Sequence, residues 1–132
     1  MVGAPGPAID MESRPYWDGL TEERLRLQRC SGCGSHRFPA MPGCPGCGGE
    51  DWEWVDAAGT GRLYSWVTVH QAFSPDFADD TPYTIATVEL DEGCRVLARL
   101  EDTPTPKVDL RLAVRYVHHP AWSEARFAEI SP

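Results

Sequence analysis

The chain has 132 residues and carries 20 acidic against 12 basic side chains, which gives a formal net charge of −8. No stretch approaches 18 consecutive apolar residues, and an acidic chain binds phosphate backbones poorly, so we expect neither a membrane nor a nucleic acid as partner. Twelve prolines and twelve glycines favour turns and short strands over long helices.

Residues 1–12 are predicted to form a flexible tail, because the first nine are small and rich in proline and glycine. This stretch lacks the charged start and the long apolar core of a secretion signal. We therefore expect a cytoplasmic chain whose cysteines stay reduced.

A short helix is expected to follow the tail. Asp10 or Ser13 can cap it, and Pro15 suits its first turn. Tyr16 and Trp17 are adjacent on this helix, and a helix of two turns cannot bury both rings without a neighbour.

Two C-x-x-C pairs come next, separated by ten residues: Cys30, Cys33, Cys44 and Cys47. Two such knuckles can place four thiolates around one ion, and the glycines after each pair allow the positive φ that a knuckle needs. The pattern predicts a closed Cys₄ site that binds structural Zn²⁺ and leaves no position for catalysis. Iron in a rubredoxin-like site remains an alternative, whereas disulfides and a thioredoxin-type redox pair fit the compartment and the spacing less well.

Short strands are predicted on both sides of the cysteines. Leu25 and Leu27 alternate with polar residues before the first knuckle, and Trp52, Trp54 and Val55 follow the second. Residues 24–56 then form a zinc ribbon, and residues 13–56 a helix-plus-ribbon unit. Because the ribbon's own core is tiny, the metal is expected to supply much of its stability.

Residues 57–132 contain five strand-like runs separated by turn signals: Arg62–His70, Tyr83–Leu90, Cys94–Leu100, Leu112–His118 and Arg126–Ile130. Five short strands without a helical period predict a small closed barrel of the OB-fold type. The predicted fold class is therefore mostly β, with a short N-terminal helix and a Cys₄ zinc ribbon followed by a five-stranded OB-fold barrel.

Alternation divides the first run of the barrel into two faces. The face expected to fill the barrel holds Leu63, Ser65, Val67 and Val69. The opposite face holds Tyr64, Trp66, Thr68 and His70. Its aromatic residues either cover the flank of the barrel and the ribbon, or contribute to a partner interface, where such residues are enriched.

The order of these motifs resembles the acyl-CoA-associated zinc-ribbon/OB-fold family, long catalogued as a domain of unknown function. The resemblance rests on Y-W-x-G at 16–19, L-x-L-Q-R-C-x-x-C-G at 25–34, F-P at 38–39, C-P-x-C-G at 44–48, G-x-G-x-L-Y-S at 59–65, T-V-H at 68–70, P-Y at 82–83 and V-E-L-D-E-G at 88–93. It covers residues 12–130, nearly the whole chain.

The resemblance implies a partner subunit of a thiolase-like enzyme, including the lipid-transfer-protein branch that acts on acyl-CoA thioesters. Such partners perform Claisen condensation or retro-aldol cleavage, as in steroid side-chain degradation. The catalytic residues would belong to the partner, and the present chain would dock on it, stabilise it and help form the channel for CoA or the acyl group. The chain is either a free-standing subunit or a domain of a longer fusion.

We assign no catalytic residue to this chain. The candidates for a partner interface are Tyr16, Trp17, Tyr64, Trp66 and His70. The candidates for contact with CoA or the acyl group are Arg62, Phe73, Tyr83, Arg95 and Arg99.

Two further features have ordinary explanations. His118 and His119 resemble a ligand pair, but neighbours on a strand point to opposite faces and do not easily share an ion. Cys94 is expected to be an inert thiol.

Two other functions stay open as alternatives. OB barrels also bind single-stranded nucleic acids, although such grooves need basic side chains beside stacking aromatics. Iron in the knuckles would instead give an electron carrier.

Overall fold

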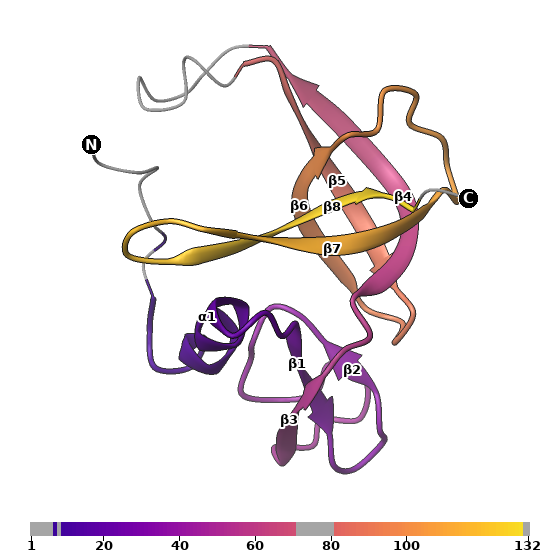
Figure 1. Ribbon diagram of the computed structural model, residues 1–132. Coiled ribbons are helices and arrows are strands. Elements are labelled where there is room, and N and C mark those ends of the chain that lie inside the picture. The colour runs from indigo at the N-terminus through magenta and orange to yellow at the C-terminus, as the bar shows by residue number, and fades with distance from the viewer. Residues whose placement is uncertain (1–6, 8, 71–80, 131–132) are drawn as a thin grey trace.

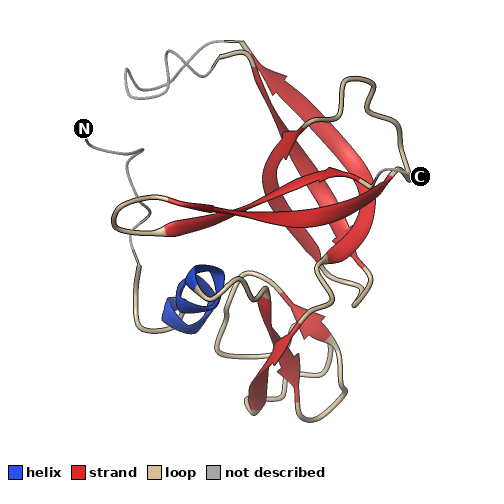
Figure 2. Ribbon diagram, viewed as in Figure 1, coloured by secondary structure: helices blue, strands red, loops and turns tan. Residues whose placement is uncertain are grey.

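Figure 1 shows a computed structural model of the chain, which describes residues 7, 9–70 and 81–130. Its elements are α1 (Arg14–Thr21), β1 (Arg26–Cys30), β2 (His36–Arg37), β3 (Trp52–Asp56), β4 (Thr60–Val69), β5 (Tyr83–Leu90), β6 (Arg95–Glu101), β7 (Arg111–His118) and β8 (Ser123–Glu129). Apart from α1, the regular elements of the described residues are strands, as the colours of Figure 2 show, which confirms the mostly β fold class.

The helix α1 begins where the sequence predicts, with Ser13 in the N-cap position and Pro15 in the first turn, but the Ser13 side chain makes no capping hydrogen bond to the helix. Asp10 braces this start, because its Oδ1 accepts hydrogen bonds from the backbone N–H and the hydroxyl of Ser13, both at 2.8 Å. The helix contacts β1, β7 and β8, and it lies beneath the β7–β8 hairpin (Figure 1).

The ribbon is a three-stranded antiparallel sheet in the order β2-β1-β3. Strand β2 was not predicted, because two residues are too few to show a period. It is held by a buried polar pair: Arg37 Nε donates to Gln28 Oε1 at 2.7 Å, and Arg37 Nη2 donates to the carbonyl of Met41 at 3.0 Å. The guanidinium of Arg37 also lies 5.0 Å from the ring centroid of Trp52.

The barrel is closed in the order β4-β5-β6-β8-β7. All of its strand pairs are antiparallel except β6 with β8. At Gly61, β4 pairs with both β5 and β7, and a Cβ at this position would lie 2.4 Å from the carbonyl oxygen of Glu89. A residue without a side chain is therefore required where the barrel closes.

A β-bulge between Leu63 and Ser65 changes the two faces of β4. Leu63 is buried as predicted, but beyond the bulge Trp66 packs against the core and Val67 is 62% exposed. The prediction that Val67 points into the barrel and Trp66 away from it was wrong, because the extra residue of a bulge reverses the alternation that follows.

One hydrophobic core runs through both parts of the molecule. It joins Leu20 of α1 and Leu25 and Leu27 of the ribbon to barrel residues such as Leu63 and Phe127. The ribbon therefore packs onto the barrel and does not depend on its own interior alone. Among the described residues, no helix has the length and apolar character needed to cross a membrane.

Candidate metal centre and candidate docking residues

The four predicted ligand cysteines meet at one point of the ribbon. Their Sγ atoms all lie within 4.8 Å of one another, with 3.6 Å between Cys30 and Cys47 and 3.7 Å between Cys33 and Cys44. A tetrahedral site with metal–sulfur bonds of about 2.3 Å has sulfur–sulfur edges of about 3.8 Å. The cluster thus has the size of a four-thiolate metal site.

The knuckles form through local turns. The N–H of Gly34 donates to the carbonyl of Cys30 at 2.9 Å, and the N–H of Gly48 donates to that of Cys44 at 2.8 Å. Both glycines have positive φ, +78° and +77°, as the motif predicts. The spacing within each pair therefore determines the direction of its two thiols.

Ser35 supports the site, and no motif in the sequence indicated this role. Its Oγ lies 3.1 Å from the Sγ of Cys33 and 3.6 Å from that of Cys44. This hydroxyl lowers the pKa of the Cys33 thiol, and it is the main cause that lowers the pKa of Cys44 to about 5. A hydrogen bond to sulfur favours the thiolate form that binds a metal.

Cys94 lies away from this cluster and is half-buried. Burial is the main cause that raises the pKa of its thiol to about 11. A thiol that resists ionisation is a poor nucleophile, which agrees with the prediction of an inert residue.

The helix candidates for a partner interface have neighbours within the molecule. The Tyr16 ring lies 5.0 Å from that of Phe38, and burial raises the pKa of Tyr16. The Trp17 ring lies 6.1 Å from that of Trp122 at the tip of the β7–β8 hairpin. A small cavity of about 220 Å³ remains beside the two helix rings, lined also by Phe38 and Pro39.

The other three interface candidates lie on β4 or just after it, and their exposure differs. Tyr64 is 40% exposed, whereas Trp66 packs against the core. His70 is exposed just beyond the end of β4. The structure does not gather the five interface candidates into one patch.

The CoA candidates form two groups on the barrel. Arg62 and Arg95 share Glu89, at 2.9 Å and 3.4 Å, and the Arg95 guanidinium lies 3.7 Å from the ring centroid of Tyr64. Arg62 also pairs with Asp109.

The other CoA group is formed by Tyr83 and Arg99. The Arg99 guanidinium lies 4.2 Å from the Tyr83 ring centroid. Arg99 lies four positions after Arg95 on β6, a distance of about 13 Å in a strand. Phe73 lies outside the described residues.

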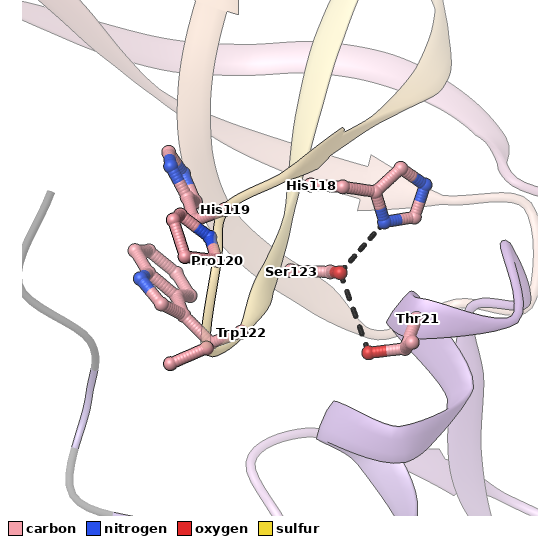
Figure 3. Close-up of a pocket in the computed structure, with 7 residues that line it drawn as sticks. Thr21, His118, His119, Pro120, Trp122 and Ser123 are labelled. Carbon is pink, nitrogen blue, oxygen red and sulfur yellow. Dashed lines mark hydrogen bonds between the residues drawn. The ribbon is translucent and has the colours of Figure 1, made fainter. Parts of the chain in front are cut away.

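A second cavity, of about 230 Å³, lies where the β7–β8 hairpin meets α1 (Figure 3). Ser123 Oγ is 2.7 Å from His118 Nδ1 and 3.3 Å from Thr21 Oγ1, and Glu23 Oε2 is 3.5 Å from His118 Nε2. Ser123 is only 4% exposed. Its hydroxyl links the β7–β8 hairpin to Thr21 of α1 by a hydrogen bond.

His119 contacts residues other than those of His118 (Figure 3). Its Nε2 lies 2.8 Å from Glu124 Oε1, and its ring stacks on Trp122 with centroids 4.4 Å apart. The different partners of His118 and His119 confirm that the two adjacent side chains diverge.

A Cys₄ ribbon followed by a closed OB-fold barrel defines the class of protein. Two family models match in the same order: "ChsH2, rubredoxin-like zinc ribbon domain" over residues 17–53, and "ChsH2, C-terminal OB-fold domain" over residues 54–117. The solved structure "Ltp2-ChsH2(DUF35) aldolase" contains a chain that is 33% identical. The two chains superpose with a TM-score of 0.83 over 94% of this chain and 98% of that one. The chain belongs to the DUF35 family.

Curated proteins whose sequences resemble this chain include proteins named as enzyme subunits. A "Probable enoyl-CoA hydratase alpha subunit" from Thermomonospora curvata is 38% identical over 83% of this chain and 34% of its own length. "Benzoylsuccinyl-CoA thiolase subunit BbsA" from Thauera aromatica is 37% identical over 61% of this chain and 54% of its own length. The chain thus spans about a third of the hydratase subunit and about half of the thiolase subunit.

Proposed function

We propose that the chain is a non-catalytic subunit that docks on, and stabilises, a thiolase-like enzyme acting on acyl-CoA thioesters. The observation that carries this proposal is the similarity, over almost its full length, to the ChsH2 chain of an aldolase. A thiolase subunit among the relatives supports the same class of partner. The partner would perform retro-aldol cleavage, as in steroid side-chain degradation, or Claisen condensation, in a hetero-oligomer in the cytoplasm.

We propose Zn²⁺ as the ion held by the four cysteines. The compact set of four sulfurs suits its tetrahedral preference, and the hydroxyl of Ser35 supports thiolates at Cys33 and Cys44. When bound, this ion supplies structural cross-linking only, because four protein ligands complete its coordination. Purified protein should be colourless and contain about one zinc per chain. A red, iron-containing protein would favour an electron carrier instead.

The residues proposed to contact CoA or the acyl group are Phe73, Tyr83, Arg95 and Arg99. Arginine pairs well with phosphate because its planar donors match two oxygens at once. Arg62 is the weakest candidate, because Glu89 and Asp109 already share its charge. Acyl-CoA would then lie at the interface shared with the partner.

Co-production with a thiolase-like protein from the same organism tests the proposal. We expect the two proteins to elute together in size-exclusion chromatography at micromolar concentration, and the partner to gain solubility and turnover. Separate elution, with no effect on the partner's solubility or turnover, would contradict the proposed function.

A further inference from the structure

The cysteine cluster pairs exposed and buried thiols across its two knuckles. Cys33 of the first knuckle is exposed, and its Sγ lies 3.7 Å from that of Cys44, which is only 4% exposed. Cys47 of the second knuckle is exposed, and its Sγ lies 3.6 Å from that of Cys30, which is fully buried. Each exposed sulfur therefore has a buried sulfur of the other knuckle as a close neighbour. We call Cys33–Cys44 and Cys30–Cys47 the crossed pairs.

Two glycines leave one crossed pair without a covering side chain. A Cβ at Gly32 would lie 3.5 Å from the Sγ of Cys47 and 3.7 Å from that of Cys30. A Cβ at Gly49 would lie 3.3 Å and 3.6 Å from the same two sulfurs. A small molecule can thus approach the Cys30–Cys47 pair from the side of the bare backbone.

An accessible thiolate beside a second one is the arrangement that peroxides oxidise to a disulfide. Metal-binding cysteines are held as thiolates, which are the reactive form. The exposed thiolate attacks the O–O bond of hydrogen peroxide, which gives a sulfenic acid and one hydroxide ion. The neighbouring thiolate then attacks the sulfenic sulfur, which gives the disulfide and a second hydroxide ion. The two sulfurs lose two electrons, and the peroxide gains them.

We propose that the cysteine cluster is a site of oxidation by peroxides, which convert the crossed pairs into two disulfides and release the metal. The inference rests on the Zn²⁺ proposed above. A metal ligand must be a thiolate, and a disulfide sulfur no longer is one. Because both disulfides join one knuckle to the other, they connect the same parts of the ribbon as the metal does. The oxidised ribbon therefore stays closed, and a dithiol returns it to the metal-binding form.

The first test treats the purified, zinc-loaded chain with hydrogen peroxide and follows zinc release with a coloured indicator. We expect about one zinc per chain to be released as about two molecules of peroxide are consumed. A dithiol with added Zn²⁺ should restore the original zinc content. The oxidised chain should melt several degrees above the reduced chain treated with a chelator, because its knuckles remain cross-linked.

Trypsin then distinguishes the crossed pairs from disulfides within a knuckle. Cleavage after Arg29, Arg37 and Arg62 gives fragment 30–37, with both cysteines of the first knuckle, and fragment 38–62, with both of the second. Crossed disulfides hold the two fragments together until they are reduced, and mass spectrometry of the joined fragments should identify both crossed pairs. Disulfides within the knuckles would leave the fragments separate.

Gly32→Ala tests the open approach to the Cys30–Cys47 pair. The φ of Gly32 lies outside the left-handed region, and the added methyl group would make ordinary contacts with the two sulfurs. Zinc content should be unchanged, but the Cys30–Cys47 disulfide should form at least about twofold more slowly, because reactivity follows exposure. Gly43→Ala is the matched control, because a Cβ there would have no sulfur within 4 Å. Its rate should equal that of wild type.

Four results would overturn the inference. A zinc-loaded chain that keeps its metal in peroxide contradicts the inference alone, and so does zinc release that leaves the tryptic fragments separate. Oxidation of the cysteines to sulfonic acids without disulfides contradicts it as well. A purified chain without zinc contradicts the proposed ion together with the inference. Co-elution with the thiolase-like protein is measured separately, so failure of the proposed docking function is distinguishable from all four.

Discussion

Asp91 forms hydrogen bonds to residues of β4 and β7 at the end of the barrel nearest the ribbon. It lies in the turn between β5 and β6 and accepts two hydrogen bonds from Arg111 at the start of β7, at 2.8 Å and 3.0 Å. The hydroxyl of Thr60, at the start of β4, also donates to it. Arg111 is the main cause that lowers the pKa of Asp91 from 3.8 to about 2.

The ionisation of Asp91 should make the stability of the folded chain depend on pH. A pKa that is lower in the folded state adds stability above the unfolded value near 3.8, and that stability is lost as the pH falls toward 2. We therefore expect Asp91→Asn to lower the thermal midpoint modestly at pH 7, with the difference from wild type disappearing between about pH 4 and pH 2. Asp18→Asn, at an exposed carboxylate of α1, is the control and should change little at any pH. A constant difference across this range would contradict the assignment.

At the scale of elements, the proposed metal is expected to stabilise the ribbon. Cys33→Ser removes one of four ligands and should abolish stoichiometric zinc binding, unfold the ribbon and lower the thermal midpoint by on the order of 10 °C or more. Affinity for the partner should fall as well. Elemental analysis and a melting curve measure both effects.

Cys94→Ser is the matched control, because Cys94 lies in the barrel and outside the metal cluster. It should keep one zinc per chain and nearly the wild-type midpoint. If Cys33→Ser also keeps its zinc and its midpoint, the structural role of the metal is wrong.

The observed elements agree with the predicted ones where the hydrophobic period extends over enough residues to be recognised. The predicted run Tyr83–Leu90 coincides with β5, and the first turn of α1 contains Pro15 as expected. Strand β2 was missed because its stability comes from the Gln28–Arg37 pair, which joins residues on two strands. The bulge in β4 was missed because it depends on which residues of β5 pair with it.

At the scale of the whole molecule, the shared core couples the ribbon to the barrel. Leu25 is only 1% exposed and belongs to the same cluster as the barrel leucines. A substitution in the ribbon should therefore destabilise both units together.

Leu25→Ala should lower the free energy of unfolding by about 2–4 kcal/mol through lost burial and a cavity. Zinc release and loss of the near-ultraviolet signal of the barrel should shift to the same lower denaturant concentration. Leu97→Ala, an exposed leucine on β6, is the matched control and should cost less than about 0.5 kcal/mol in the isolated chain. Separate transitions for zinc release and barrel unfolding would show that the two units are independent.

The cysteine cluster and the order of ribbon and barrel can be predicted from local sequence patterns. Each C-x-x-C knuckle is a local turn, so the spacing within each pair directs two thiols to one side, and the ribbon sheet then brings both pairs together. By contrast, long-range packing determines which aromatic and aliphatic residues remain on the surface. Tyr16 and Trp17 meet Phe38 and Trp122 only once the helix, ribbon and hairpin pack together. Val67 faces outward because pairing between β4 and β5 creates a bulge, and such pairing depends on residues far apart in the chain.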